Sequence, residues 1–162
     1  MKGTDRPRKP SLLDSVRRAQ LGVGERALLP GGNVNERDRD GRTPLFFAAL
    51  HGEAELARAL LSAGAEVNSA DRKGRTALHA AAAGYHPDLV EILLAAGADI
   101  EAEDSFGGTP LLRATGESKG RGDVIRVLLA HGADRTRKNK SGVSPEILAA
   151  RIANHDVAQF FK

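Results

Sequence analysis

The chain has no cysteine and no tryptophan among its 162 residues, and aromatic residues make up only 4% of it. Without cysteine, disulfide bonds, thiolate metal sites and cysteine nucleophiles are excluded. So few aromatic side chains disfavour a sheet built on bulky cross-strand pairs. The apolar residues, 41% of the chain, are mostly Ala and Leu, which favours closely packed helices.

Long hydrophobic runs are also missing. No run approaches the 18 or so apolar residues that a membrane-spanning helix needs. The basic start of the chain leads into residues 11–20, where charges interrupt any apolar core of a signal peptide. We therefore expect a cytoplasmic protein with no membrane association.

Excess charge is confined to the N-terminus. Residues 1–10 hold four of the 24 basic residues and one of the 21 acidic ones, which accounts for the whole net charge of +3. This proline-containing segment is predicted to be a disordered basic tail. The rest of the chain is neutral, so we do not expect a nucleic-acid partner.

The chain does contain an internal repeat. The phrase GRTPLFFAALHG returns as GRTALHAAAAGY and again as GGTPLLRATG, so that Thr43, Thr76 and Thr109 are each 33 residues apart. A fixed period of this size marks small units that bury their apolar faces only by stacking on one another. In such an array the functional surface is expected to extend over several units.

Residues 71–103 show how one unit is built. Thr76 precedes an Ala-rich run and is placed to cap a first helix. A second helix with one apolar face is predicted over residues 88–96. Gly97 follows it, in the left-handed position that ends many helices. An extended turn then leads into the next unit.

The motif Asp-x-x-Gly-x-Thr-Pro-Leu-His-x-Ala-Ala, followed by Leu-Leu-x-x-Gly-Ala-Asp, resembles the ankyrin repeat. The resemblance implies an all-α repeat solenoid, in which helix-turn-helix units are joined by β-hairpin-like turns. It covers residues 11–162 as a single domain. The units expected are an N-terminal cap unit at 11–37, full repeats at 38–70, 71–103 and 104–138, and a C-terminal cap unit at 139–162.

Several positions depart from the family pattern. Phe46 and Leu112 stand where the family has a histidine, which this chain keeps only as His79. Tyr85 takes the place of the turn glycine in the second full repeat. Phe46 is expected to be buried between its hairpin and helix, whereas Glu146 leaves the packing of the closing unit open.

Ankyrin arrays generally bind other proteins through their hairpin tips and the concave face of their first helices, and the resemblance carries this expectation onto the chain. Phe47 with Leu50 is predicted to form an apolar patch, with packing inside the fold as the alternative. Charges alternate in blocks along the tips, which suits a protein surface of matching pattern better than a row of phosphates. The residues expected to bind a partner are Arg39, Asp40, Arg42, Phe47, Leu50, His51, Arg72, Lys73, Arg75, Ala83, Ser105, Phe106, Arg113 and Lys140.

No pattern in the sequence points to catalysis, a cofactor or a metal. The segment at residues 116–120 has the glycine, lysine and serine of a phosphate loop but not their order. The five histidines are scattered, and none has metal-ligand spacing. We therefore expect a monomeric, non-enzymatic protein that binds a partner protein. The alternative is an inhibitor or immunity-type protein that occludes a partner enzyme, since an adaptor needs two sites and the chain shows one domain.

Overall fold

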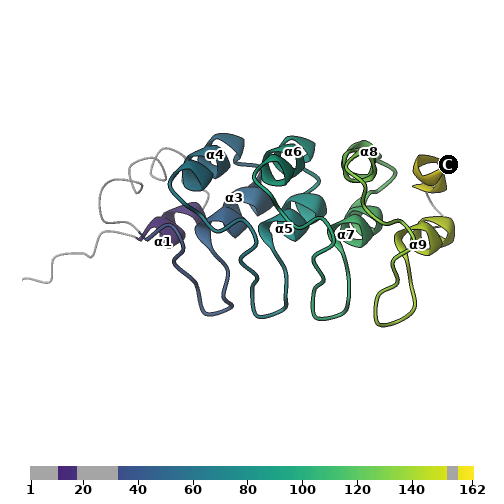
Figure 1. Cartoon of the computed structure of the whole chain (residues 1–162), viewed down its shortest axis with the longest axis horizontal. Coiled ribbons are helices and arrows are strands. Elements are labelled where there is room, and N and C mark those ends of the chain that lie inside the picture. The colour runs from purple at the N-terminus through teal and green to yellow at the C-terminus, as the bar shows by residue number, and fades with distance from the viewer. Residues whose placement is uncertain (1–10, 18–32, 153–156) are drawn as a thin grey trace, which may run out of the picture.

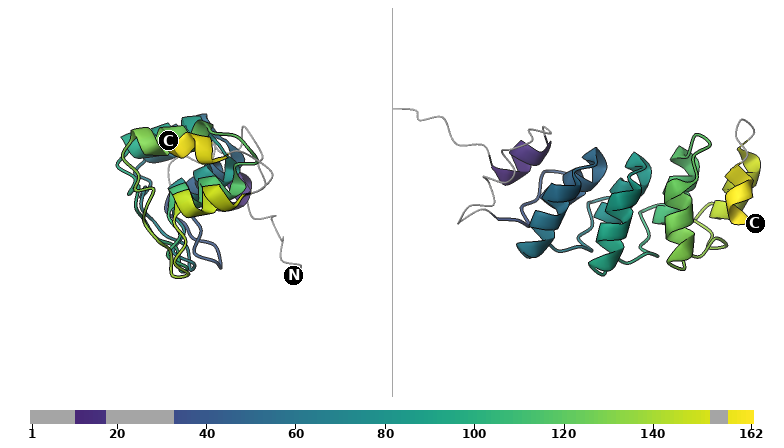
Figure 2. Two further views of the ribbon diagram at one scale, coloured as in Figure 1. Left: turned by 90° about the vertical axis from the view of Figure 1, so that its right-hand side faces the viewer. Right: turned by 90° about the horizontal axis from the view of Figure 1, so that it is seen from above.

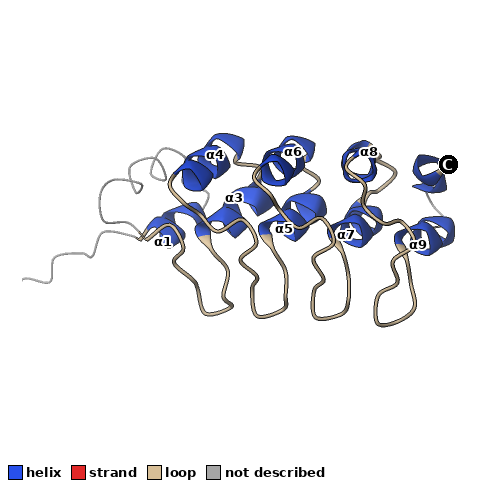
Figure 3. Ribbon diagram, in the orientation of Figure 1, coloured by secondary structure: helices blue, strands red, loops and turns tan. Residues whose placement is uncertain are grey.

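The computed structural model describes residues 11–17, 33–152 and 157–162. Within these residues the regular elements are all helical, and no strand is present (Figure 3). The basic tail and most of the N-terminal cap unit lie outside the described residues. The elements are α1 (Leu12–Arg17), α3 (Pro44–His51), α4 (Ala54–Ser62), α5 (Ala77–Gly84), α6 (Pro87–Ala95), α7 (Pro110–Glu117), α8 (Asp123–Ala130), α9 (Pro145–Arg151) and the 3-10 helix η1 (Val157–Phe161).

The helices form two layers that run the length of the molecule (Figure 1). Helices α1, α3, α5, α7 and α9 make the inner layer, and each packs on the next. Helices α4, α6 and α8 make the outer layer, and η1 packs on α9. The expected all-α repeat solenoid is confirmed, because each helix buries its apolar face against its own unit and its neighbours.

Four loops project from the same side of the inner layer (Figures 1 and 2). Each contains a five-residue turn, and we call these the first to fourth hairpin turns. They comprise residues 38–42, 71–75, 104–108 and 139–143. In each turn the first residue accepts a hydrogen bond from the amide of the fourth, and its own amide donates to the carbonyl of the fifth.

The inner helices begin as the sequence predicts. The hydroxyls of Thr43 and Thr109 accept hydrogen bonds of 3.3 Å from backbone amides three residues later, and a proline occupies the first turn of each helix. Ser144 caps α9 in the same way. Helix α6 begins at Pro87, one residue earlier than expected, and Ala96 is its C-cap.

Tyr85 is the C-cap of α5 and adopts the left-handed conformation, with φ of 62°. At the corresponding position after α3 the C-cap is a glycine, Gly52. Its ring is buried, and its hydroxyl donates to the carbonyl of Arg121. The Arg121 guanidinium lies over the ring, 4.0 Å from its centroid. The tyrosine therefore fixes the longer turn between α7 and α8 to the preceding unit.

The hairpin turns are joined to one another by backbone hydrogen bonds. The amide of Arg72 donates to the carbonyl of Asp40 at 2.8 Å, and the amide of Ser105 donates to the carbonyl of Lys73 at 2.7 Å. The second and third turns lie so close that position 74 must be a glycine, where φ is 73° and an added Cβ would lie 3.1 Å from the Glu103 carbonyl oxygen. The absence of a side chain at Gly74 allows both the left-handed backbone of its own turn and the close approach of the next turn.

Substitution of Gly74 by alanine is expected to destabilise the array more than the same change at Gly64. Both glycines have positive φ, but a Cβ at Gly64 would meet nothing within 4 Å. Gly64→Ala therefore costs about 1 kcal/mol of left-handed strain, and Gly74→Ala costs about 1 kcal/mol more because the next turn must shift. Urea denaturation of the two variants measures the difference, and equal losses would contradict the close approach.

His79 links the first helix of its unit to the next hairpin turn. Its Nδ1 lies 3.2 Å from the backbone nitrogen and 3.0 Å from the hydroxyl of Thr76, and its Nε2 lies 2.9 Å from the carbonyl oxygen of Gly108. The ring is buried. Burial lowers the pKa of His79 from its ordinary 6.5, against the hydrogen bond to Gly108, which raises it. The folded protein therefore favours the neutral ring.

Folding stability is expected to decline as pH falls below the ordinary histidine pKa of 6.5. The unfolded chain binds the proton more readily than the fold does, so the contribution of His79 is complete above that value and is lost as pH falls toward the lowered folded pKa. Urea midpoints at pH 7.5, 6.5 and 5.5 measure this slope. In His79→Leu the slope should flatten, and an unchanged slope would assign it to other groups.

Candidate functional site

A buried aspartate opens each of the first three hairpin turns. The side chains of Asp38, Asp71 and Asp104 are 6%, 1% and 1% exposed. One oxygen of each carboxylate accepts two hydrogen bonds of 2.8–2.9 Å from backbone amides of its own turn. The other oxygen binds an arginine. Each carboxylate thus holds its turn in shape and pairs with a cation.

The arginine partners come from two different places. Arg42 and Arg75 lie four residues after their aspartates, and their guanidinium nitrogens approach to 2.8 and 2.7 Å. In the third turn Gly108 occupies that place, and Arg113 reaches back from α7 to Asp104 instead. Arg113 therefore replaces the missing arginine of its turn.

The ion pairs control the ionisation of these carboxylates. Burial raises the pKa of Asp38 and Asp104, but hydrogen bonds from Arg42 and Arg113 and from the backbone amides outweigh it. The pKa of both groups therefore lies below the ordinary 3.8. Three arginines that the sequence assigns to partner binding, Arg42, Arg75 and Arg113, are thus engaged inside the fold and only partly exposed.

Three other cations predicted for the site have no side-chain partner in the part of the chain that the structure describes. Arg39, Arg72 and Lys73 are exposed on the first and second hairpin turns. Within the described residues their side chains form no hydrogen bond or ion pair. Asp40 shares Arg42 with Asp38, so the charges of the first hairpin turn balance. The excess positive charge therefore lies on the second hairpin turn, at Arg72 and Lys73.

The expected apolar patch of Phe47 and Leu50 does not form. Phe47 is 4% exposed, because the Arg42 guanidinium covers its ring at 5.0 Å from the centroid and Phe46 packs against its edge. Phe46 is equally buried, as predicted. Leu50 remains exposed at the end of α3, with His51 beside it.

A narrow groove of about 220 Å³ runs between the hairpin turns and the inner helices. Leu50 and Ala83 line it on the helix side, and the three paired arginines line it on the turn side. Glu117 lies at its far end and is exposed. The groove brings together predicted residues from three units.

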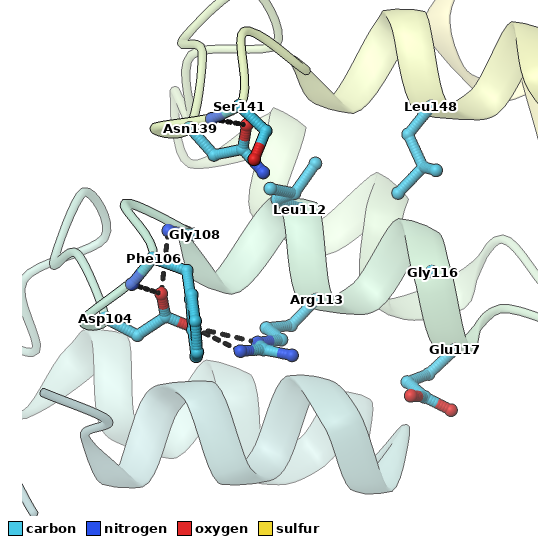
Figure 4. A pocket seen from close by; sticks show the side chains of 10 residues that line it. All are labelled: Asp104, Phe106, Gly108, Leu112, Arg113, Gly116, Glu117, Asn139, Ser141 and Leu148. Atoms are coloured by element: carbon cyan, nitrogen blue, oxygen red, sulfur yellow. Dashed lines mark hydrogen bonds and ion pairs between the residues drawn. The ribbon is translucent and has the colours of Figure 1, made fainter. Parts of the chain in front are cut away.

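A wider pocket of about 400 Å³ adjoins this groove, between α7, α9 and the third and fourth hairpin turns (Figure 4). Phe106 forms one wall and is 64% exposed. Leu112 and Leu148 supply apolar surface, and Gly116 lies between them and Glu117. Of these five residues, only Phe106 is among the predicted site residues.

The third and fourth hairpin turns hold the remaining predicted residues. Ser105 and Lys140 are both exposed. The Lys140 ammonium donates to the Ser105 carbonyl at 2.8 Å, and the Lys140 amide donates to the Phe106 carbonyl at 3.0 Å. These contacts join the two turns and fix the rim of the pocket.

Neither a membrane-spanning helix nor a metal cluster occurs in the described part of the chain. No helix there is long and apolar enough to cross a bilayer. In the same residues no three His, Asp or Glu side chains gather where they could hold a metal ion.

Comparison with known protein families agrees with the two-layered array. A family model described as ankyrin repeats (3 copies) matches residues 16–104 and 80–162. The chain therefore belongs to the ankyrin-repeat family. Ankyrin repeats generally mediate protein–protein interaction and are typically non-catalytic. No curated protein matches the chain in sequence.

Removal of a paired arginine is expected to destabilise the fold, whereas removal of a free one is not. Arg75→Ala and Arg113→Ala each leave a buried carboxylate without its cation, at a cost of about 1–3 kcal/mol. Arg72→Ala touches no such pair and should stay within about 0.5 kcal/mol of the wild type. Urea denaturation distinguishes them. If Arg113→Ala unfolds like Arg72→Ala, the Asp104 pair does not stabilise the turn.

Proposed function

We propose that this protein binds another protein through its hairpin turns and the groove beneath them, without catalysing a reaction. The observation that supports this most directly is a set of exposed cations, Arg39, Arg72 and Lys73, which have no side-chain partner among the residues that the structure describes. An exposed cation without a partner in the fold is hydrated by solvent, and it is available to form an ion pair with a second molecule. The cytoplasmic location and the monomeric state remain predictions.

The rigidity of the turns supports the same function. Each of the first three turns is held by a buried aspartate, and neighbouring turns are joined by a hydrogen bond such as that from the Ser105 amide to the Lys73 carbonyl at 2.7 Å. A partner would therefore meet a surface already in its bound shape. Little conformational entropy is lost on binding such a surface, and more of the contact energy becomes affinity.

The sign of the free charge selects the kind of partner surface. Arg72 and Lys73 are adjacent and exposed, and Arg39 lies on the turn before them. An acidic region of the partner would be attracted to them. Binding should then weaken as salt rises, because exposed charges are screened within about 10 Å at 0.1 M salt.

Charge reversal at the second hairpin turn is expected to abolish capture of the partner. The variant is Arg72→Glu with Lys73→Glu, and neither side chain has an internal role in the described structure. The matched control, Arg58→Glu with Lys119→Glu, makes the same change in net charge on α4 and on the turn between α7 and α8. Affinity capture from a lysate of the source organism, read by mass spectrometry, compares both with the wild type.

A protein retained by the wild type and the control but lost from the turn variant would identify the partner. A partner retained equally by all three would place the binding surface elsewhere. Measuring the captured protein's own activity, with and without this chain, then separates an adaptor from the inhibitor considered above.

A further inference from the structure

We propose that the pocket between α7 and α9 receives one apolar side chain of an extended partner segment, whose neighbouring acidic residues bind Arg72 and Lys73. This inference rests on the proposed function, because it names the part of the partner that the array recognises. The inference gives a role to a pocket that the exposed cations of the hairpin turns do not line. The pocket can prove unoccupied even if the protein does bind a partner through those turns.

The pocket exists because one row of side chains becomes smaller along the array. In each unit this row consists of the last residue of the hairpin turn and the residues four and eight positions later, on the first helix. Across the first two units the large members pack on the next unit. The Arg75 guanidinium lies 5.5 Å from the Phe46 ring centroid, and His79 reaches the Gly108 carbonyl. The three rows are Arg42, Phe46, Leu50; Arg75, His79, Ala83; and Gly108, Leu112, Gly116.

In the third unit this row leaves open space. Two of its three members are glycines, and Leu112 makes no polar contact in place of the histidine. A Cβ added to Gly116 would meet only Leu148 Cδ2, at 3.7 Å. The missing side chain of Gly116 therefore leaves open volume between the third unit and the C-terminal unit, whereas a Cβ at Gly108 would meet Asp104 Oδ2 at 3.1 Å.

Two polar side chains of the pocket are held inside the fold. The Arg113 guanidinium is bound to Asp104. The Asn139 side-chain oxygen accepts hydrogen bonds from the backbone amides of Ser141 and Val143, at 3.0 and 2.9 Å. The apolar surfaces of the pocket are the Phe106 ring, Leu112 and Leu148 (Figure 4). Apolar groups that gain burial from an occupant favour an apolar side chain there.

Charges at the two ends of the pocket indicate the acidic flank and its direction. Next to the Phe106 end lies the second hairpin turn with its free cations, joined by the bond between Ser105 and Lys73. At the other end Glu117 is exposed and has no ion pair within the described residues. A carboxylate of the partner is attracted to the first end and repelled from the second.

The spacing between units sets the length of the recognised segment. Adjacent helices pack about 8–10 Å apart, and an extended chain advances about 3.3–3.6 Å per residue. The acidic residues are therefore expected about three positions from the apolar one. The groove is smaller than the pocket, at about 220 Å³ against about 400 Å³, and three arginines line it.

The test selects peptides from a phage-displayed library of random dodecapeptides on the immobilised full chain. Selected sequences are expected to carry Leu, Met or Phe with Asp or Glu about three residues away. The most enriched peptide is then synthesised with a fluorescent label. Its affinity is measured by anisotropy for the wild type, Gly116→Met, Gly116→Ala and the Arg72→Glu, Lys73→Glu variant.

Gly116→Met fills the pocket and should lower the affinity for the peptide by roughly tenfold or more, as loss of a central anchor residue does. Gly116→Ala makes the same helix-favouring change but leaves the pocket open, so it should bind as the wild type does. The charge-reversed variant should bind more weakly, and the difference from the wild type should shrink as salt rises. Thermal melts of each variant confirm that it is folded.

Three results would overturn the proposal. These are no enrichment, enriched peptides without the apolar and acidic pattern, and equal affinity for Gly116→Met and Gly116→Ala. If capture of a protein still depends on Arg72 and Lys73, any of these results removes only the anchor pocket. If that capture also fails, binding by the hairpin turns fails with it.

Discussion

The buried carboxylates of Asp38, Asp71 and Asp104 hold the hairpin turns that carry the surface of this array. Each carboxylate accepts two amides of its own turn and binds one arginine, so the turn keeps its shape although it projects into solvent. The turn then donates one backbone hydrogen bond to the turn before it. In the fourth turn the Asn139 side-chain oxygen accepts the two corresponding amide hydrogen bonds, so the hydrogen bonds to this oxygen are common to all four turns.

The arginine that pairs with each buried carboxylate comes from two different places, and the difference affects the surface beside the turn. In the first two units the arginine comes from the turn itself, and it also covers a phenylalanine ring. In the third unit Gly108 removes that arginine, and Arg113 takes over the pairing from α7. The carboxylate remains satisfied, but the space beside Leu112 is no longer filled. A pocket results without loss of the turn.

Much of the fold could be predicted from local patterns. Thr43 and Thr109 cap helices where a threonine–proline pair stands, and Tyr85 occupies the left-handed position left by a displaced glycine. The site was harder to predict. The sequence left Phe47 either on the surface or packed inside the fold, because its position on a first helix does not reveal that Arg42 covers it. The pocket was not predicted, although a comparison of the repeats shows that the side chains at these three positions become smaller, down to Gly108, Leu112 and Gly116.

The sequence by itself determined the class of the protein, because the 33-residue period, the caps and the glycines are local signals that each unit repeats. It also determined which residues lie at the hairpin turns. Only the tertiary structure decided which of those residues are free. Arg72 and Arg75 are three positions apart, yet one lies in solvent and the other is held by a buried carboxylate. That division depends on three-dimensional pairing and burial, which the order of residues does not display.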